Sequence, residues 1–191
     1  MALQITEIGT TNWAAYFSVS PAFLVTSTLE CETADGGFGG IKLTERAVAT
    51  PYTKFAESET HIAWAEHFDL NTWGIFLATA SGRPVGGAAV APPTPTMIAP
   101  QGQPDTATLF DIRVAASARR SGVDTALFRR AVEWARASGC KFLVIETQDN
   151  NVPACRFYAR NGCELLEIRR LAYRLTPAVA LENMLIWRLA L

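Results

Sequence analysis

The chain has 191 residues, of which 49% are apolar and 18% charged, so it carries enough apolar side chains for one folded domain with a sizeable core. Its 17 Lys and Arg against 18 Asp and Glu lack the basic excess typical of proteins that bind a nucleic-acid backbone. No apolar run fits a membrane span, and the first residues lack the features of a secretory signal. Four scattered cysteines and only two histidines argue against a disulfide framework and a zinc site. We therefore expect a soluble cytoplasmic protein without a metal, and with neither a nucleic acid nor a membrane as partner.

The first part of the chain predicts extended segments followed by a helix. Residues 23–29 and the segment from Ile41 onward are rich in β-forming side chains, and they flank a glycine-rich turn at residues 36–40. A helix is expected over residues 58–68. The two extended segments therefore predict a pair of strands joined by a flexible turn.

The middle of the chain predicts a hairpin and a long loop. Residues 73–79 and 84–91 are expected to be strands joined at Ser81-Gly82, and the pair Gly86-Gly87 indicates a bulge or the close approach of another backbone. Five prolines between residues 92 and 104 mark an irregular loop of the kind that covers or shapes a site.

A strand, a helix and a second strand are expected next. Residues 108–114 alternate between apolar and polar side chains, which predicts a strand with one apolar face. A helix with a broad apolar stripe follows, with Asp124 or Thr125 as its cap and Gly139 at its end. The nearly continuous apolar run at residues 141–146 predicts a buried central strand.

The last elements are one helix and two strands. Asn151 is expected to cap the helix and Gly162 to close it, with strands over residues 163–173 and 182–191. The sequence as a whole therefore predicts an α/β (α+β) fold in which helices pack on a mixed sheet.

The turn Arg119-Arg120-Ser121-Gly122 lies between a predicted strand and a predicted helix. Such a loop directs backbone N–H groups and the positive end of the helix dipole toward an anion, and the arginines add positive charge. The turn therefore suits a pyrophosphate. On the turn alone, a glycine that only shapes the chain beside solvated arginines is the more economical explanation.

A second motif follows 29 residues after that turn. Asn151, Ala154 and Tyr158 are spaced by three and four, so they share one helix face, and Asn161-Gly162 follows them. The two motifs together resemble the GCN5-related N-acetyltransferase (GNAT) superfamily, in which an Arg-x-x-Gly-x-Gly/Ala motif binds acyl-CoA and an Asn-x-x-Ala-x-x-x-Tyr-x-x-x-Gly motif comes later. The resemblance covers residues 73–173.

A narrower resemblance connects the chain with the streptothricin acetyltransferases. The run from Ile145 to Tyr158 is similar to theirs, as are Pro51-Tyr52-Thr53-Lys54 and the late strand over residues 182–187. Two residues depart from the superfamily pattern: Asp124 stands where Gly or Ala is usual, and Cys163 stands where an aromatic residue is usual. A carboxylate repels a nearby pyrophosphate, although local N–H groups can absorb part of its charge.

The resemblance implies a GNAT-type, mostly antiparallel central sheet flanked by helices, in one N-acetyltransferase domain over residues 1–191. Within it, residues 1–72 would shape the acceptor site, residues 73–173 would form the acyl-CoA-binding core, and residues 174–191 would add a C-terminal strand. The implied reaction moves an acetyl group from acetyl-CoA to a primary amine of a small molecule, such as a streptothricin-like antibiotic, by direct attack in a ternary complex. Such an enzyme would confer antibiotic resistance. A homodimer is also implied, because the resembling enzymes often pair.

Two other functions are open at this stage. A non-catalytic module that binds acyl-CoA as a sensor would share the fold, and Asp124 favours that alternative. A peptide or protein N-acetyltransferase would share the mechanism. The match of Asn151 and Tyr158 to the motif spacing favours an enzyme.

The resemblance also implies which residues bind acyl-CoA. The backbone of residues 112–114 would meet the pantetheine arm and the thioester carbonyl, residues 119–125 would hold the phosphates, and Asn151 would bind the pantetheine or orient the thiol end. The full set is Ile112, Arg113, Val114, Arg119, Arg120, Ser121, Gly122, Val123, Asp124, Thr125, Asn151, Ala154 and Tyr158.

Tyr158 is the candidate general acid for the departing thiolate. A phenol with a pKa near ~10 that protonates a thiolate near ~8.5 works uphill by roughly 2 kcal/mol, a small cost that a hydrogen bond to the thiolate reduces. The structural alternative is a half-buried core aromatic residue whose hydroxyl is satisfied.

Two carboxylates are candidates for the general base. Asp111 lies on the polar face of its strand, and Glu146 lies at the end of the buried strand. A carboxylate with a pKa of about 4 is a weak base toward an ammonium near ~10, so it would hold the ammonium or act through water. The structural alternatives are an ion pair with Arg113 for Asp111, and a cap or a bond to the following turn for Glu146.

An aromatic cluster is the candidate acceptor region. Its members are Tyr52, Phe55, Trp64, Phe68, Trp73 and Phe76, with Glu57, Glu59 and Glu66 close in sequence. Such clusters are usually core, but rings beside carboxylates can also line a groove for a cationic amine. We expect Tyr52, Trp64, Trp73 and Glu146 to contact the acceptor, with the proline-rich loop over it.

Overall fold

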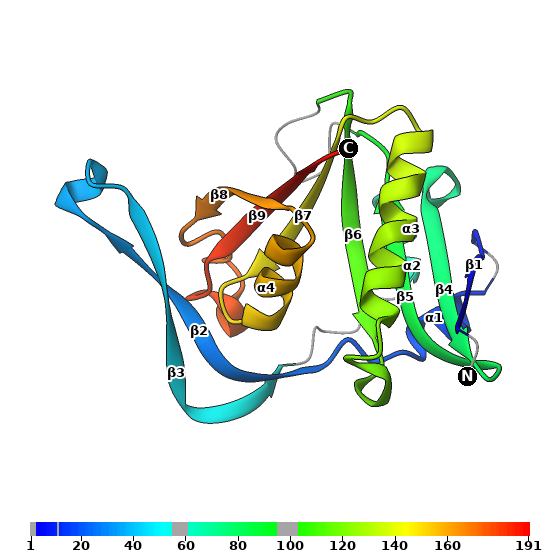
Figure 1. The fold of residues 1–191 in the computed structure, drawn as a ribbon, viewed down its shortest axis with the longest axis horizontal. Coiled ribbons are helices and arrows are strands. Elements are labelled where there is room, and N and C mark those ends of the chain that lie inside the picture. Colours follow the sequence, from blue (N-terminus) through cyan, green and yellow to red (C-terminus); the bar gives the residue numbers. More distant parts are fainter. Residues whose placement is uncertain (1–2, 11, 55–60, 95–102) are drawn as a thin grey trace. The chain divides into compact units, whose positions relative to one another are not determined.

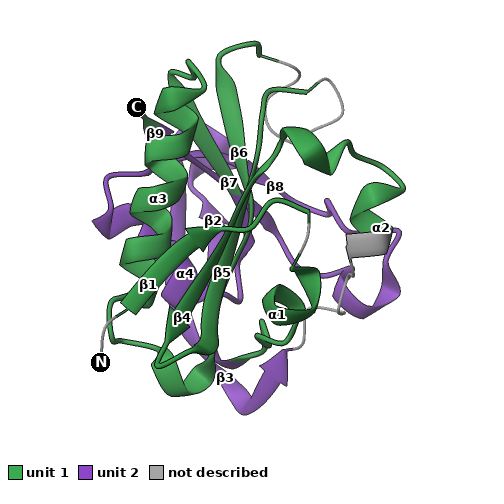
Figure 2. Ribbon diagram, turned by 90° about the vertical axis from the view of Figure 1, so that its right-hand side faces the viewer, with its two compact units in different colours: residues 1–23, 55–145, 190–191 green, residues 24–54, 146–189 purple. Residues whose placement is uncertain are grey.

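The computed structural model describes residues 3–10, 12–54, 61–94 and 103–191, and the chain divides into two compact units (Figures 1 and 2). Unit 1 comprises residues 1–23, 55–145 and 190–191, and unit 2 comprises residues 24–54 and 146–189. Each unit is therefore assembled from segments that are far apart in the sequence. The single domain over residues 1–191 stays a prediction.

Unit 1 contains a mostly antiparallel sheet. Its strands lie in the order β1-β4-β5-β6-β7. Their bounds are β1 (Leu3–Glu7), β4 (Gly74–Ala80), β5 (Arg83–Ala91), β6 (Thr106–Val114) and β7 (Phe142–Gln148). The last three residues of β7 belong to unit 2. All neighbours are antiparallel except β6 and β7, which are parallel. The predicted β4–β5 hairpin is confirmed, and both residues of its turn, Ser81 and Gly82, have positive φ, as tight hairpin turns of this kind require.

Helices cover both faces of this sheet. They are α1 (Trp13–Phe17), α2 (His61–Ala65) and α3 (Val123–Ala137). A Cβ on Gly86 would lie 2.8 Å from Leu127 of α3, and a Cβ on Gly87 would lie 2.5 Å from the ring of Tyr16 in α1. Because successive residues of a strand point to opposite faces, α3 and α1 lie on opposite sides of β5, as Figure 2 shows. Of the two alternatives expected from the glycine pair, the bulge is supported by a register shift beside Gly86, whereas the nearest atoms to both glycines belong to side chains and not to another backbone.

An aromatic cluster packs beneath α1 and α2 and forms part of the core of unit 1. The rings of Trp13, Tyr16 and Trp64 meet edge to face with centroids 5.7 to 6.2 Å apart, and the ring centroid of Trp64 lies 5.1 Å from that of Phe110 in β6. Such geometry is favourable for aromatic pairs beyond the area that they bury. The cluster therefore fastens α1 and α2 to one face of the sheet.

Unit 2 holds one helix and two pairs of strands. The bounds are β2 (Phe23–Thr33), β3 (Ile41–Lys54), α4 (Val152–Arg160), β8 (Glu164–Arg169) and β9 (Met184–Ala190). β2 and β3 form the long two-stranded ribbon seen in Figure 1, and β8 pairs antiparallel with β9. Short 3-10 turns lie at Asp35–Gly37, Leu70–Thr72, Ala116–Ala118 and Pro177–Val179. The described helices include none that is long and apolar enough to cross a membrane.

Several boundaries differ from those expected from the sequence. Gly122 is the N-cap of α3, and Asp124 and Thr125 lie inside the first turn, so neither is the cap. β8 ends at Arg169, four residues earlier than expected. β1 and α1 were not expected, because neither has a strong local signal; α1 has no side-chain cap and forms where tertiary packing supports it. The predicted α4 is confirmed, with Asn151 as its N-cap and Gly162 at φ 85° after its end.

Candidate functional site

The turn between β6 and α3 lies in unit 1. Arg119 donates from Nε to the carbonyl of Val114 at 3.3 Å and from Nη2 to the carbonyl of Ala22. Its guanidinium therefore ties the end of β6 to the segment that precedes β2. Arg120 is exposed at φ 61°, and its guanidinium has no hydrogen-bond partner among the described residues. Of the two arginines, Arg120 is the one whose charge is available to an anion.

The N-terminus of α3 presents free backbone N–H groups. The first hydrogen bond of the helix runs from the N–H of Ala126 to the carbonyl of Gly122. The N–H groups of Val123 and Asp124 therefore have no partner within the helix. Asp124 Oδ1 accepts a hydrogen bond from the N–H of Thr125 at 2.8 Å. The hydroxyl of Ser121 donates to the carbonyl of Ala118 within the turn, at 2.6 Å. Because the Asp124 carboxylate is engaged by a helix-terminal N–H, part of its repulsion toward a bound anion is offset.

One edge of β6 lacks a strand partner beside this turn. Residues 112–114 pair with residues 86–88 of β5 on one side. On the other side the parallel pairing with β7 ends at Leu109. In the described part of unit 1, the backbone beyond Leu109 therefore has one edge to which an extended ligand rich in amides could add.

Asp111 is the centre of a partly buried charge cluster. Its Oδ2 accepts 2.6 Å bonds from Arg113 Nε and from the hydroxyl of Tyr16. The Arg113 guanidinium also lies 4.9 Å from the ring centroids of Tyr16 and Phe17. Burial and the neighbouring carboxylate hold the pKa of Tyr16 well above its ordinary value, so the phenol is the donor. The geometry favours the structural alternative for Asp111, which is the ion pair with Arg113.

The second motif lies on α4 in unit 2. Asn151 Oδ1 accepts from the N–H of Ala154 at 3.3 Å and so caps the helix. Tyr158 lies two turns later, 4% exposed, with its ring centroid 6.4 Å from that of Trp187. The oxygen of the Asn151 side chain is thus engaged by the helix. Its amide nitrogen is the donor that a ligand could use.

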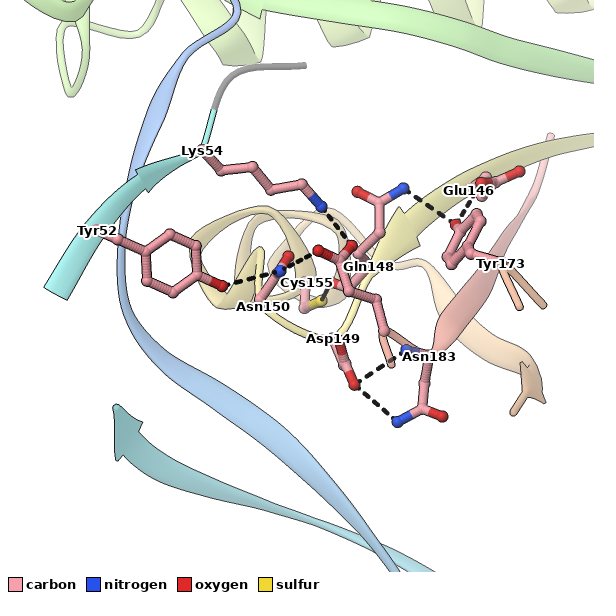
Figure 3. A network of polar contacts seen from close by, with 10 residues as sticks. Tyr52, Lys54, Glu146, Gln148, Asp149, Asn150, Cys155, Tyr173 and Asn183 are labelled. Carbon is pink, nitrogen blue, oxygen red and sulfur yellow. Dashed lines mark hydrogen bonds and ion pairs between the residues drawn. The ribbon is translucent and has the colours of Figure 1, made fainter. Parts of the chain in front are cut away.

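A polar network in unit 2 joins β3, the β7–α4 turn and the segment before β9 (Figure 3). Asn150 donates from Nδ2 to Glu182 Oε1 at 2.9 Å and to the hydroxyl of Tyr52 at 3.3 Å. Glu182 also forms an ion pair with Lys54, and both side chains are about 15% exposed. Oδ1 of Asn150 is buried without a partner among the described residues. A buried unpaired acceptor of this kind is available to a donor from a ligand.

The same network continues along β7. Tyr173 donates from its hydroxyl to Glu146 Oε1 at 2.5 Å and accepts from Gln148 Nε2 at 3.0 Å. Asp149 accepts from the side-chain amide of Asn183 at 2.7 Å, and burial raises the pKa of its carboxyl. The network holds the carboxylates of Glu146, Asp149 and Glu182. Lys54 pairs with Glu182 and the Arg169 guanidinium lies near Glu146, so the formal charge of the network stays negative.

Trp64 and Trp73 lie in the aromatic cluster of unit 1, where they are 3% and 4% exposed. Their ring centroids are 6.0 Å apart, and Trp73 lies 4.8 Å from Phe110. This burial favours the core role for both tryptophans. Phe55, Glu57 and Glu59, and residues 95–102 of the proline-rich loop, lie outside the described residues.

The predicted site residues fall into two groups. Those expected to hold the phosphates and the pantetheine arm are in unit 1, apart from three on α4. Tyr52, Glu146, Asn151 and Tyr158 are all in unit 2. Four members of the polar network were not expected from the sequence to have a role in the site: Asn150, Tyr173, Glu182 and Asn183. The polar run Gln148-Asp149-Asn150 directly after a buried strand was the signal that could have pointed to this network.

A comparison with protein families supplies an independent assignment. Residues 42–163 match the model of the "Acetyltransferase (GNAT) family", which is more than half of the chain. The match spans the turn at Gly122 and the whole of α4, and it confirms the superfamily resemblance inferred from the sequence.

Two curated relatives are streptothricin acetyltransferases. The chain is 47% identical over 55 residues to streptothricin acetyltransferase A of Bacillus subtilis (strain 168), covering 29% of this chain and 32% of that protein. It is 36% identical over 83 residues to the streptothricin acetyltransferase of Escherichia coli, covering 44% of this chain and 48% of that protein. The matches thus span about a third and about half of the relatives' lengths, and they confirm the narrower resemblance.

Solved structures share the fold over the full chain. The crystal structure of nourseothricin acetyltransferase has a TM-score of 0.79 and 26% identity, covering 100% of this chain and 99% of that one. A streptothricin acetyltransferase-like protein of Bacillus anthracis str. Ames, solved in complex with acetyl coenzyme A, has a TM-score of 0.77 and 23% identity, covering 100% and 98%. The expected GNAT-type α/β fold, with its mostly antiparallel sheet and flanking helices, is therefore confirmed.

Proposed function

The chain belongs to the acetyltransferase (GNAT) family, and from this premise we propose that it transfers an acetyl group from acetyl-CoA to a primary amine of a small cationic molecule. A streptothricin-like antibiotic is the proposed acceptor, because the curated relatives are streptothricin acetyltransferases. Such an activity would confer resistance to the antibiotic.

The N-terminus of α3 is the observation that carries the proposal. The N–H groups of Val123 and Asp124 point out of the helix without partners in it, behind the left-handed Gly122. A helix start of this kind favours a phosphate by its dipole and by direct hydrogen bonds, and Arg120 adds a charge that no described residue pairs with. The residues present therefore fit the pyrophosphate of acetyl-CoA.

The unpaired edge of β6 extends this fit along the cofactor. Alternate backbone groups of residues 110–114 on that edge can bond to the amides of a pantetheine arm. Asn151 would contribute its amide nitrogen, the group that remains after Oδ1 has capped α4. Bound acetyl-CoA supplies the acyl group as a thioester; the protein contributes binding, orientation and proton transfer.

Tyr158 is the proposed general acid. It holds the phenol proton that a departing thiolate needs, and the transfer costs roughly 2 kcal/mol between the ordinary pKa values of the two groups. Its ring is packed on α4 and near Trp187, so its rotamer is held by the core of unit 2. A fixed phenol is better placed for proton transfer than a mobile one.

The polar network of unit 2 is the proposed site for the acceptor. Its net negative charge suits an ammonium, and Tyr52, 45% exposed, offers a ring face beside it. Glu146 is the proposed residue that holds the ammonium or accepts its proton through water. Asp111, by contrast, is engaged by Arg113 and Tyr16, so we assign it to the structure of unit 1.

Thiol release from acetyl-CoA in the presence of streptothricin tests the proposal. We expect turnover by the wild-type protein and a loss of about 100-fold or more in kcat for Tyr158→Phe, because the phenyl ring keeps the packing but has no proton to give. The acetyl-CoA dissociation constant of the variant, measured by isothermal titration, should stay within about twofold of the wild type. Full turnover by the variant would remove Tyr158 from the mechanism.

The same assay separates the alternatives. A protein that binds acetyl-CoA but releases no thiol with any amine is the sensor module, and one that acetylates only peptide amines is a peptide N-acetyltransferase. The cytoplasmic location and the homodimer remain predictions, and sedimentation velocity of the purified protein tests the second.

A further inference from the structure

We propose that Tyr173 is a positioning residue for acetyl transfer, which fixes the orientation of the Glu146 carboxylate toward the acceptor amine. This inference rests on the proposed function, in which Glu146 holds that amine. Tyr173 lies outside the family motifs quoted from the sequence, and it stands between β8 and β9, after the end of β8 at Arg169.

The hydrogen bonds around Tyr173 have a fixed direction. An ionised carboxylate only accepts and an amide N–H only donates, so the phenol donates to Glu146 Oε1 at 2.5 Å and accepts from Gln148 Nε2 at 3.0 Å. Burial and the Glu146 carboxylate raise the pKa of Tyr173, so the phenol keeps its proton throughout the physiological pH range. Figure 3 shows Tyr173 in this position beside both partners.

The segment that carries Tyr173 is bonded to β7 and to the turn after it at several successive points. Besides the two bonds of Tyr173, Glu182 accepts from Asn150, and Asn183 donates to Asp149 from both its backbone and its side chain. Gln148, Asp149 and Asn150 thus each have a partner in this one connecting segment, and Asn150 has a second one in Tyr52 of β3. The segment is therefore bonded to β7 and the following turn near its start, through Tyr173, and at its end, through Glu182 and Asn183.

The geometry explains why Glu146 needs such a partner. Glu146 is only half-buried on β7, and an exposed glutamate samples several rotamers. A charge-assisted hydrogen bond of 2.5 Å selects one of them. The bond from Tyr173 occupies one of the about four lone-pair sites of the carboxylate and restrains its rotation. A misplacement of a reacting group by 1 Å can lower the rate about 100-fold. Loss of the bond that orients Glu146 should therefore lower kcat/KM for the amine.

The test compares steady-state acetyl transfer by the full-length wild type and by Tyr173→Phe. We expect kcat/KM for the amine to fall about tenfold, the size expected from one hydrogen bond to a charged group, while the KM for acetyl-CoA is unchanged. The acidic limb of the pH profile should shift to higher pH, because the phenol donates to the ionised form of Glu146 and stabilises it. The other charged groups near this pair, Arg169 and Glu182, remain in the variant.

A double-mutant cycle shows whether Tyr173 acts through Glu146. Glu146→Gln alone and together with Tyr173→Phe should have nearly the same kcat/KM, because the tyrosine has no effect once the carboxylate is gone. Leu175→Ala is the matched control: this side chain is 86% exposed in the same segment, and we expect no kinetic change. Gln148→Leu, a second variant that keeps the phenol but removes its amide donor, should lower kcat/KM in the same direction by a smaller factor.

The outcomes are distinct. If the wild type transfers acetyl groups and Tyr173→Phe and Gln148→Leu leave both kcat/KM and the pH profile unchanged, the positioning role is wrong while the proposed function stands. Effects of Tyr173→Phe and Glu146→Gln that multiply would equally overturn it. A wild type that acetylates no amine would overturn the proposed function and this inference together.

Discussion

Tyr16 and Arg113 both donate 2.6 Å hydrogen bonds to the same oxygen of Asp111, although Tyr16 precedes Asp111 by 95 residues. The bond fastens α1 to β6 of unit 1, and the ring of Tyr16 at the same time packs over Gly87. A helix of five residues without a side-chain cap is not stable by itself. This tertiary contact is therefore one physical reason why α1 exists.

Removal of the Asp111 charge should destabilise the fold. In Asp111→Asn, the buried guanidinium of Arg113, 6% exposed, loses its counter-charge, and we expect the free energy of unfolding to fall by about 3 kcal/mol in urea titrations. Glu167→Gln is the control: it breaks a similar carboxylate–arginine pair two residues apart on β8, where both side chains are more than a third exposed, so the loss should be about 0.5 kcal/mol. A stable Asp111→Asn variant that has lost only kcat would instead restore Asp111 as the proton acceptor.

Alanine at Gly122 should weaken acetyl-CoA binding through the backbone. Gly122 and Gly139 flank α3 at φ 86° and 77°, and a Cβ at either would have no neighbour within 4 Å. Both Gly122→Ala and Gly139→Ala should therefore cost about 1 kcal/mol of stability from left-handed strain alone. Only the first should raise the dissociation constant of acetyl-CoA in isothermal titration, and Gly122→Glu should abolish binding at micromolar concentration. Equal effects of the two alanine variants on binding would place the phosphates elsewhere.

Two substitutions of Asn151 should separate its structural role from its ligand role. Asn151→Asp keeps the oxygen that caps α4, so its unfolding midpoint should stay close to that of the wild type, whereas Asn151→Ala should lose about 1 kcal/mol. Both variants lack the amide nitrogen, so both should show a raised KM for acetyl-CoA. Normal kinetics in Asn151→Asp would limit Asn151 to capping.

Two buried thiols should make the stability of the protein fall at alkaline pH. Burial raises the pKa of Cys155 to about 12 and that of Cys163 to about 11. The folded state therefore keeps both thiols neutral, while in the unfolded chain they ionise from about pH 8.5. Their contribution to stability is complete below that pH and declines as the pH rises, by up to about 1.4 kcal/mol per pH unit for each thiol. Urea titrations under reducing conditions at pH 7.5 to 9.5 should show a smaller decline for Cys155→Ala; parallel curves would refute the assignment.

Local sequence signals were sufficient for the elements that carry the two motifs. The hairpin turn at Ser81-Gly82 and the cap and stop of α4 at Asn151 and Gly162 depend on backbone preferences that act within a few residues. The predicted cap of α3 was wrong. Asp124 has a side chain suited to capping, but the N-cap is Gly122, two residues earlier and in the left-handed conformation. Short, weakly patterned elements such as α1 were missed because packing, not propensity, stabilises them.

The sequence by itself therefore determined the fold class, because hydrophobic periodicity and turn chemistry are local properties of the chain, and its two motifs carried the resemblance to the family. Only the tertiary structure decided which polar side chains work together. It paired Asp111 with Tyr16 and Arg113, buried Trp64 and Trp73 in the core, and joined Glu146 to Tyr173, 27 residues away. The Asp111–Arg113 pair was open from the sequence because the two residues share a strand face, but the bonds from Tyr16 to Asp111 and from Tyr173 to Glu146 join residues distant in the chain, and no spacing in the sequence reveals those.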